Sequence, residues 1–327
     1  MIRTLEGERP VESLRVGDAV LVSSDQGLTI RLVTWVGSGD VLVDASRPDD
    51  EAGHPVRFRA GAIEPSVPDR DLYITAEHNV FLRGALVPAR MLVNGDSIAY
   101  DRTRSQYKVY HFRTGDHAII WSNNMATETF LDDGNLSGLV PDADSAAVVA
   151  ASEPQALAAP LNVTREFVEP LFYDLARVGE TLAESAPKPQ RRQDSDMHLT
   201  SADGRVIRPT RQMDDMVVFH VPTEIEEVWI RSNSARPSDT EGPFVDDRRD
   251  LGVLIGDILL WDTDHTSRLD AHLKDEVLEG WYGLESEPMR WTNGNARLVL
   301  GSRKVGAPGV LGIHVKARAL YEPVVTG

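Results

Sequence analysis

The stretch from Leu72 to Leu82 contains residues whose types and spacing could carry out chemistry. It reads as two short apolar strands, Leu72–Ile74 and Val80–Leu82, with Thr75-Ala-Glu-His78 between them. A hydroxyl and an imidazole three residues apart at a strand end can both point at one peptide bond. The hydroxyl would supply a hydrogen bond, and the imidazole would donate or accept a proton near neutral pH. Taken alone, a histidine beside a strand is more often a structural residue, so the flanking sequence has to decide.

Short sequence blocks on both sides of this stretch follow a characteristic order. The blocks are Ile2-Arg-Thr-Leu-Glu-Gly7, Val16-Gly-Asp18, Pro88-Ala-Arg-Met-Leu-Val-Asn-Gly95, Val109-Tyr-His111-Phe, Asp116-His117-Ala-Ile-Ile and Glu128-Thr-Phe-Leu131. In this order they resemble the Hint module, the Hedgehog/intein autoprocessing fold, in its bacterial branch. The resemblance covers about residues 1–135. The region from about residue 194 onward resembles the tail found behind such modules in related bacterial proteins.

The resemblance implies a demanding reaction. In this family a cysteine at the start of the module attacks the carbonyl of the preceding residue, and a second nucleophile resolves the resulting thioester. Because an amide is resonance-stabilised, the site must stabilise an oxyanion and protonate the departing nitrogen. The resemblance assigns this task to Thr75 and His78, and it brings His111 and His117 to the same site. Asp116 is the nearest carboxylate that could orient an imidazole.

The beginning of the sequence departs from the family pattern. The family opens with a cysteine and a short Gly-Thr turn before the Ile-x-Thr that appears here as Ile2-Arg-Thr4, whereas this sequence starts at Met1 and contains no cysteine. Thr4 cannot replace that nucleophile, because its register places it within the first strand. We therefore expect a Hint-type module without autoprocessing activity as written. Activity would require a cysteine encoded upstream, and the cleaved partner and second nucleophile stay open.

Composition limits the remaining function classes. The net charge of −17 argues against nucleic acid or an anionic membrane surface as a partner, because both would be repelled. No run of 18 apolar residues and no apolar leader after Met1 are present, which predicts a soluble protein, cytoplasmic as written or exported if an upstream segment exists. The absence of cysteine excludes disulfides and thiolate metal sites. The compartment and the oligomeric state stay open.

The pattern along the chain predicts an all-β fold with two domains. Short alternating strands separated by turn signals occupy residues 1–136, the expected Hint domain. Residues 137–193 are expected to form a linker that contains one amphipathic helix at about 164–185, with Thr164 as its N-cap. Strand patterns resume over residues 194–327 and predict a β-sandwich or jelly-roll-like domain.

The second domain offers one candidate ligand site. Trp281, Glu285, Arg290 and Trp291, with Tyr282 beside them, combine aromatic faces with a carboxylate and a guanidinium, which is how proteins grip sugar rings. The alternative, which large aromatic residues favour, is that the tryptophans fill the sandwich core and the charged pair lies at its rim. A binding protein for a carbohydrate or a protein partner is thus the rival of the autoprocessing module.

No cofactor and no metal ion are expected. The aspartates and histidines between Asp262 and His272 fit a solvated loop better than a metal site. Neither G-x-G-x-x-G nor a P-loop occurs, so nucleotide chemistry has no support.

Overall fold

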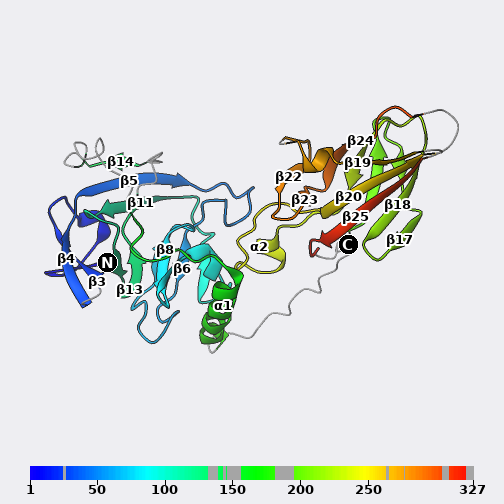
Figure 1. The fold of residues 1–327 in the computed structure, drawn as a ribbon. Helices are drawn as coiled ribbons and strands as arrows, with labels where there is room; N and C mark the ends of the chain where they lie inside the picture. Colours follow the sequence, from blue (N-terminus) through cyan, green and yellow to red (C-terminus); the bar gives the residue numbers. More distant parts are fainter. Residues whose placement is uncertain are drawn as a thin grey trace. The chain divides into compact units, whose positions relative to one another are not determined.

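A computed structural model of the chain describes residues 1–24, 27–131, 139–142, 145, 156–180, 195–262, 265–275, 277–303 and 309–321. Contacts divide the chain into two compact units. Unit 1 comprises Met1–Ala186 and Pro243–Asp246, and unit 2 comprises Pro187–Gly242 and Asp247–Gly327. Both units consist mainly of antiparallel strands, which confirms the predicted all-β class (Figure 1). No helix within the described ranges is long and apolar enough to span a membrane.

The described residues of unit 1 form three antiparallel sheets. The largest has eight strands, and the two others have three strands each. The large sheet is formed by β1 (Ile2–Thr4), β2 (Gly7–Arg9), β3 (Ala19–Ser24), β4 (Gly27–Leu32), β8 (Asn79–Leu82), β9 (Ala85–Pro88), β12 (Ile119–Ser122) and β13 (Met125–Glu128). The second sheet has the order β10 (Ile98–Tyr100), β6 (Val56–Phe58) and β7 (Leu72–Ile74); the third has the order β11 (Gln106–Arg113), β5 (Trp35–Leu42) and β14 (Val140–Pro141).

Alternation of apolar and polar residues explains how these strands pack. In β3, Val20 and Val22 are buried while their neighbours are partly exposed, so one face of the hairpin points inward. They pack with Ile2, Phe112 and Ile120 in one apolar cluster. The sequence pattern over residues 28–35 suggests one strand, but the structure ends β4 at Leu32 and starts β5 at Trp35.

The predicted helix belongs to unit 1 rather than to a linker between the units. Helix α1 (Arg165–Glu180) directly follows Thr164, whose carbonyl accepts hydrogen bonds from the N–H groups of Phe167 and Val168. Its buried residues Val168, Leu171 and Leu175 join a second apolar cluster with residues of η2 (Ala89–Leu92). Of the predicted linker, residues 137–138, 143–144, 146–155 and 181–193 lie outside the described residues.

A short segment from far along the sequence completes this second cluster. Phe244 is 2 % exposed, and its ring centroid lies 5.2 Å from that of Phe172 and 5.8 Å from that of Tyr173, both on α1. The neighbouring Asp246 forms an ion pair with the buried Arg90 at 2.8 Å. Residues Pro243–Asp246 are therefore an integral part of unit 1.

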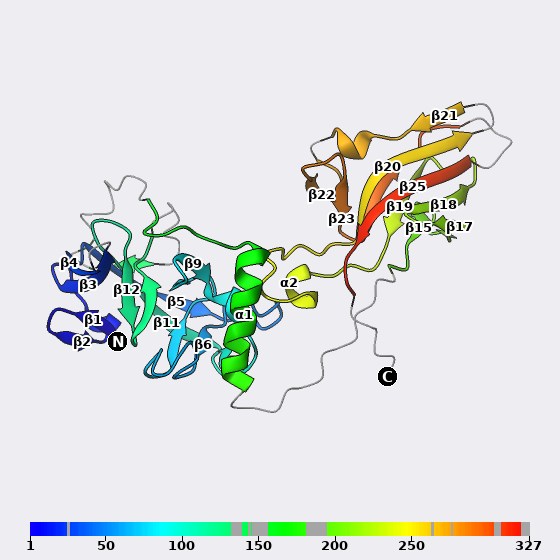
Figure 2. The ribbon, with the colours of Figure 1, turned by 60° about the horizontal axis from the view of Figure 1, so that its bottom comes forward.

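Unit 2 is a sandwich of two antiparallel sheets, as the sequence predicts. One sheet has the order β16 (Val206–Ile207), β15 (His198–Ser201), β19 (Glu227–Arg231) and β24 (Asn295–Val299). The other has the order β17 (Arg211–Met213), β18 (Met216–Val221), β25 (Gly309–Arg318), β20 (Val253–Asp262), β23 (Arg290–Thr292) and β22 (Trp281–Leu284), with β21 (His265–Arg268) also on β20 (Figure 2). Inward residues of both sheets, such as Ile230 and Leu298 from one and Phe219 and Ile313 from the other, share one core.

Candidate functional site

A cavity of about 640 Å³ in unit 1 collects the residues singled out from the sequence. Met1, Thr75, His78 and His111 all line it. They come from three places in the sequence: the start of the chain, the turn after β7 and strand β11. The structure thus brings three of the five candidate catalytic residues to one cavity beside the N-terminus of the chain.

The turn between β7 and β8 presents Thr75 and His78. β7 ends at Ile74 and β8 begins at Asn79, and the turn is closed by the N–H of His78, which donates to the carbonyl of Thr75 at 3.1 Å. The carbonyl of His78 accepts a hydrogen bond from Ala89 at 3.0 Å, which fixes the main chain behind the imidazole. Both side chains are partly exposed, and both line the cavity.

The imidazoles of His78 and His111 lie near each other, with ring centroids 6.4 Å apart. Phe130 packs against His111 at 5.0 Å on one side. Burial lowers the pKa of His78, an effect that the neighbouring His117 increases and Glu128 opposes. Burial and the proximity of His78 lower the pKa of His111 to about 4. Both rings are therefore uncharged at neutral pH, and each can accept one proton.

Glu128, at the end of β13, is the carboxylate of the site. Its Oε1 accepts hydrogen bonds from the main-chain N–H and the side-chain amide of Asn79, each at 2.9 Å. Its Oε2 lies 3.1 Å from Nε2 of His117. Burial alone would raise the pKa of Glu128, but His117, His78 and the N–H of Asn79 outweigh it and lower the pKa.

His117 supports the site from behind the carboxylate. It is 4 % exposed, and it is absent from the residues that line the cavity. Its Nδ1 accepts a hydrogen bond from the N–H of Ala158 at 2.9 Å, so the ring proton of the neutral form lies on Nε2, facing Glu128. His117 can therefore act on His78 through Glu128 but not directly on a group in the cavity.

Asp116 does not join this group. Its carboxylate is exposed and forms an ion pair with Arg31 at 3.0 Å. The carboxylate beside an imidazole is Glu128 instead, which corrects the assignment made from sequence proximity. Glu128 had a visible signal, because it opens the Glu128-Thr-Phe-Leu131 block, but that signal did not single out the carboxylate.

Side chains of a tight turn hold the first residue of the chain. The turn between β12 and β13 consists of Asn123 and Asn124, both with positive φ, a conformation that asparagine tolerates better than most residues. Oδ1 of Asn123 accepts a hydrogen bond from the α-amino group of Met1 at 2.5 Å, and its N–H donates to the carbonyl of Met1 at 2.8 Å. Burial lowers the pKa of this α-amino group. A chain joined to Met1 would consequently start at the cavity.

The candidate ligand residues of unit 2 make internal contacts instead of an open patch. Trp281 is 8 % exposed and donates its indole N–H to the carbonyl of Arg297 at 2.8 Å. Arg290 is 2 % exposed, and its guanidinium donates to the carbonyls of His272, Asp275 and Tyr282. These contacts indicate a structural role for Trp281 and Arg290. The two residues are therefore not available for the predicted sugar site.

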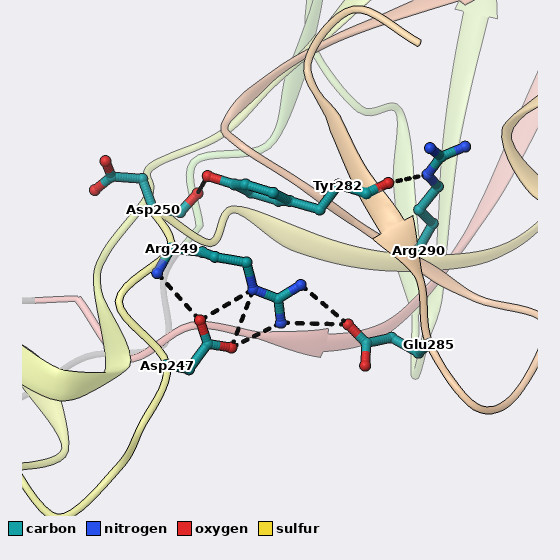
Figure 3. A network of polar contacts seen from close by, with 6 residues as sticks. All are labelled: Asp247, Arg249, Asp250, Tyr282, Glu285 and Arg290. Atoms are coloured by element: carbon teal, nitrogen blue, oxygen red, sulfur yellow. Dashed lines mark hydrogen bonds and ion pairs between the residues drawn. The ribbon is translucent and has the colours of Figure 1, made fainter. Parts of the chain in front are cut away.

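The other two candidates have structural partners as well. Glu285 forms an ion pair with Arg249 at 3.3 Å, and Arg249 also pairs with Asp247 at 2.7 Å (Figure 3). Trp291 is partly buried and packs against the cluster of Leu251, Ala319 and Tyr321. In the described ranges of the chain, no three His, Asp or Glu side chains gather as they would around a metal ion.

Comparison with known proteins agrees with the geometry of unit 1. The family model described as the Hint domain matches residues 1–134. Searches of curated proteins and of solved structures found no match. The matched region contains the cavity, the Thr75–His78 turn, His111, His117 and Glu128. Residues 1–134 of this chain therefore belong to the Hint domain family.

Proposed function

We propose that unit 1 is an autoprocessing module that acts on a peptide bond shortly upstream of its first strand. The observation that carries this proposal is the shared cavity, in which the start of the chain lies with Thr75, His78 and His111. A proton acceptor, a hydrogen-bond donor and the main chain to be processed must meet at one place for this chemistry.

The proposed reaction requires a cysteine a few residues before Met1 in a longer chain. Its thiol would lose a proton and attack the carbonyl carbon of the preceding residue, forming a C–S bond. The tetrahedral intermediate would then collapse, the C–N bond would break, and the nitrogen would take up the proton as the free amine of the cysteine. Water or another nucleophile would finally attack the thioester.

The residues of the cavity suit these proton movements. His78 is uncharged at neutral pH, so it can accept the thiol proton and return it to the departing nitrogen. The hydroxyl of Thr75, at the other end of the same turn, can donate a hydrogen bond to the developing oxyanion. The negative charge of Glu128 would stabilise the imidazolium form of His78 that exists between the two transfers.

We also propose that the 327 residues alone do not process themselves. The sequence contains no thiol. The hydroxyl of Ser122 lines the cavity, but it is hydrogen-bonded to the hydroxyl of Thr127 at 2.8 Å and lies within β12. The hydroxyls of Ser122 and Thr127 therefore cannot replace the thiol of a cysteine placed upstream of the first strand.

The test is a fusion of a soluble carrier protein, a short segment with a cysteine followed by Gly-Thr, and the full chain from Met1. Incubation with dithiothreitol or hydroxylamine should release the carrier, detected by mass, because these nucleophiles resolve a thioester. The same fusion with serine or alanine in place of the cysteine should stay intact.

Two variants assign the result to the site. His78→Ala and Thr75→Ala should each slow carrier release by at least a hundredfold, the usual contribution of one acid–base or oxyanion group. His220→Ala is the matched control, because His220 is an exposed histidine on β18 in unit 2. A cysteine fusion that remains intact under all of these conditions would count against the proposal.

A further inference from the structure

The cavity is larger than a single peptide bond requires. Besides the catalytic candidates, it is lined by Tyr73 of β7 and by Gln106, Lys108 and Tyr110 of β11. Each of these strands lies at the edge of its sheet, since β7 pairs only with β6 and β11 only with β5 in the part of the chain that the structure describes. Two strand edges therefore border one cavity.

The hydrogen bonds around β11 show which of its main-chain groups point away from β5. Just before the strand, the carbonyl of Ser105 accepts from the N–H of Val43, its partner residue across the ladder. Bonding alternates along an antiparallel ladder, so Tyr107, Val109 and His111 bond to β5. The N–H and C=O groups of Gln106, Lys108 and Tyr110 then point away from β5.

A further contact at the end of β11 agrees with this assignment. The carbonyl of Phe112, the next residue of the outward series, accepts the N–H of Phe130 at 2.9 Å. The outward edge is thus used at Phe112, and no hydrogen bond to the main chain of Gln106, Lys108 or Tyr110 comes from the described residues on that side. Three successive outward residues remain for a strand to pair with.

The same reasoning applies to β7. On the far side of β6, Asp101 donates to Pro55 and Arg59 donates to Ser97, each at 2.8 Å, which assigns Arg57 to the ladder with β10. Val56 and Phe58 therefore bond to β7, and the main-chain groups of Tyr73 point away from the sheet. β7 offers one outward residue, whereas β11 offers three.

We propose that the cavity is a groove for an extended peptide that pairs through its main chain with the outer edge of β11. The occupant is the polypeptide joined to the α-amino group of Met1, because Met1 lines the same cavity. Unpaired main-chain groups at a strand edge are a template for a further strand, and main-chain pairing is tolerant of the side chains of the peptide. The inference rests on the proposed function for its occupant, but pairing itself needs no cleavage.

The side chains that flank the groove suit such a peptide. The guanidinium of Arg104 lies over the ring of Tyr73 at 5.0 Å, and the ammonium of Lys108 lies 6.0 Å from the ring centre of Tyr110. Each tyrosine ring therefore has a cation–π contact beside a strand edge. Flat aromatic walls accommodate side chains of different shapes.

Amide hydrogen exchange of the full chain tests the proposal. The probe is an N-terminal extension of eight alternating Val and Thr residues, which spans ~26 Å when extended and contains no cysteine. The matched control is an extension of eight alternating Gly and Pro residues, which cannot form a regular strand. With the Val-Thr extension, the amides of Lys108 and Tyr110 should exchange at least tenfold more slowly than with the Gly-Pro extension. Equal exchange rates with both extensions would overturn the proposal.

A proline variant locates the pairing. In the chain with the Val-Thr extension, Lys108→Pro removes one outward N–H, so the protection of Tyr110 should be lost. The control is Ile30→Pro on β4, another edge strand, where the bond from Val33 to Asp18 likewise turns the main chain of residue 30 outward. That variant should keep the protection. Protection that survives Lys108→Pro would contradict pairing with β11.

The two proposals fail in different ways. If the carrier is not released but the amides of β11 are protected as expected, the peptide groove is supported and the proposed cleavage is not. Carrier release without protection would show that the cysteine-bearing segment reaches the site by another path.

Discussion

The two candidate sites indicated by the sequence, one in each unit, differ in whether their polar groups have hydrogen-bond partners within the protein. In unit 2, the guanidinium of Arg290 donates to three carbonyls and the indole of Trp281 donates to a fourth. In unit 1, no described residue donates to or accepts from the ring nitrogens of His78 and His111, and both rings line a cavity. Internal partners indicate a structural role, whereas polar groups left facing a cavity indicate a role toward a ligand.

The largest effect on stability is expected for a substitution in the cluster around Trp281 and Arg290. Trp281→Ala should lower the free energy of unfolding of unit 2 by ~3–5 kcal/mol, because it leaves a cavity in the sandwich core and an unpaired carbonyl at Arg297. Thermal unfolding with and without a panel of glycans measures both roles at once. The partly exposed Trp291 is the control, and Trp291→Ala should cost less. A glycan that raises the melting temperature of the parent chain would instead support the hypothesis that unit 2 binds sugars.

The second largest effect is expected from acidification, which should lower the folding stability of unit 1 through its buried histidines. The unfolded chain binds a proton at each histidine below pH ~6.5, whereas His111 in the fold does so only near pH 4. Stability is therefore fully present above pH ~6.5 and is lost as the pH falls toward 4, by on the order of 3 kcal/mol for this residue. Urea unfolding at pH 7 and pH 4.5, followed by the NMR signals of unit 1, measures the loss. His111→Asn should flatten the dependence, and an unchanged slope would refute the assignment.

Removing the charge of Glu128 should change the pKa values of the two histidines in the cavity. Glu128→Gln keeps an oxygen for the two donors of Asn79 but removes the negative charge that raises the pKa values of His78 and His111. Both pKa values should fall further, and stability should change by only ~1 kcal/mol. NMR titration of the histidine ring protons provides the measurement. Unchanged pKa values would mean that Glu128 carries no charge in the fold.

The smallest effect is expected at Asp116. Its ion pair with Arg31 is exposed, so Asp116→Ala should cost less than ~1 kcal/mol. Carrier release from the cysteine fusion should be unaffected. A loss of release comparable with that of His78→Ala would return Asp116 to the site.

Local patterns could be predicted from the sequence, but the direction of individual side chains could not. The strand Leu72–Ile74 and the turn after it follow from consecutive residues, so the sequence identifies Thr75 and His78. Proximity in sequence favours Asp116, which is next to His117, yet neighbouring residues outside regular structure can point in different directions. Its direction depends on Arg31, a partner supplied by the tertiary fold.

The domain to which a segment belongs is equally hard to predict from the sequence, because it also depends on partners supplied by the tertiary fold. The periodicity of α1 identifies a helix, but its place in unit 1 depends on contacts with η2 and with Phe244, which are distant in sequence. In unit 2, the composition around Trp281 and Arg290 was compatible with both a sugar site and a core. Only the carbonyls that surround Arg290 distinguish the two, and carbonyl positions are not visible in a sequence.

The position of Phe244 in the core of unit 1 has a consequence for synthesis of the protein. Ribosomes make the chain from the N-terminus, and α1 leaves the exit tunnel before Pro243–Asp246 has been translated. Strands β15 to β19 are made in the interval. The aromatic surface of Phe172 and Tyr173 therefore lacks Phe244 while the first strands of unit 2 emerge, and during this period unit 1 is a natural client for chaperones that shield apolar surface on nascent chains.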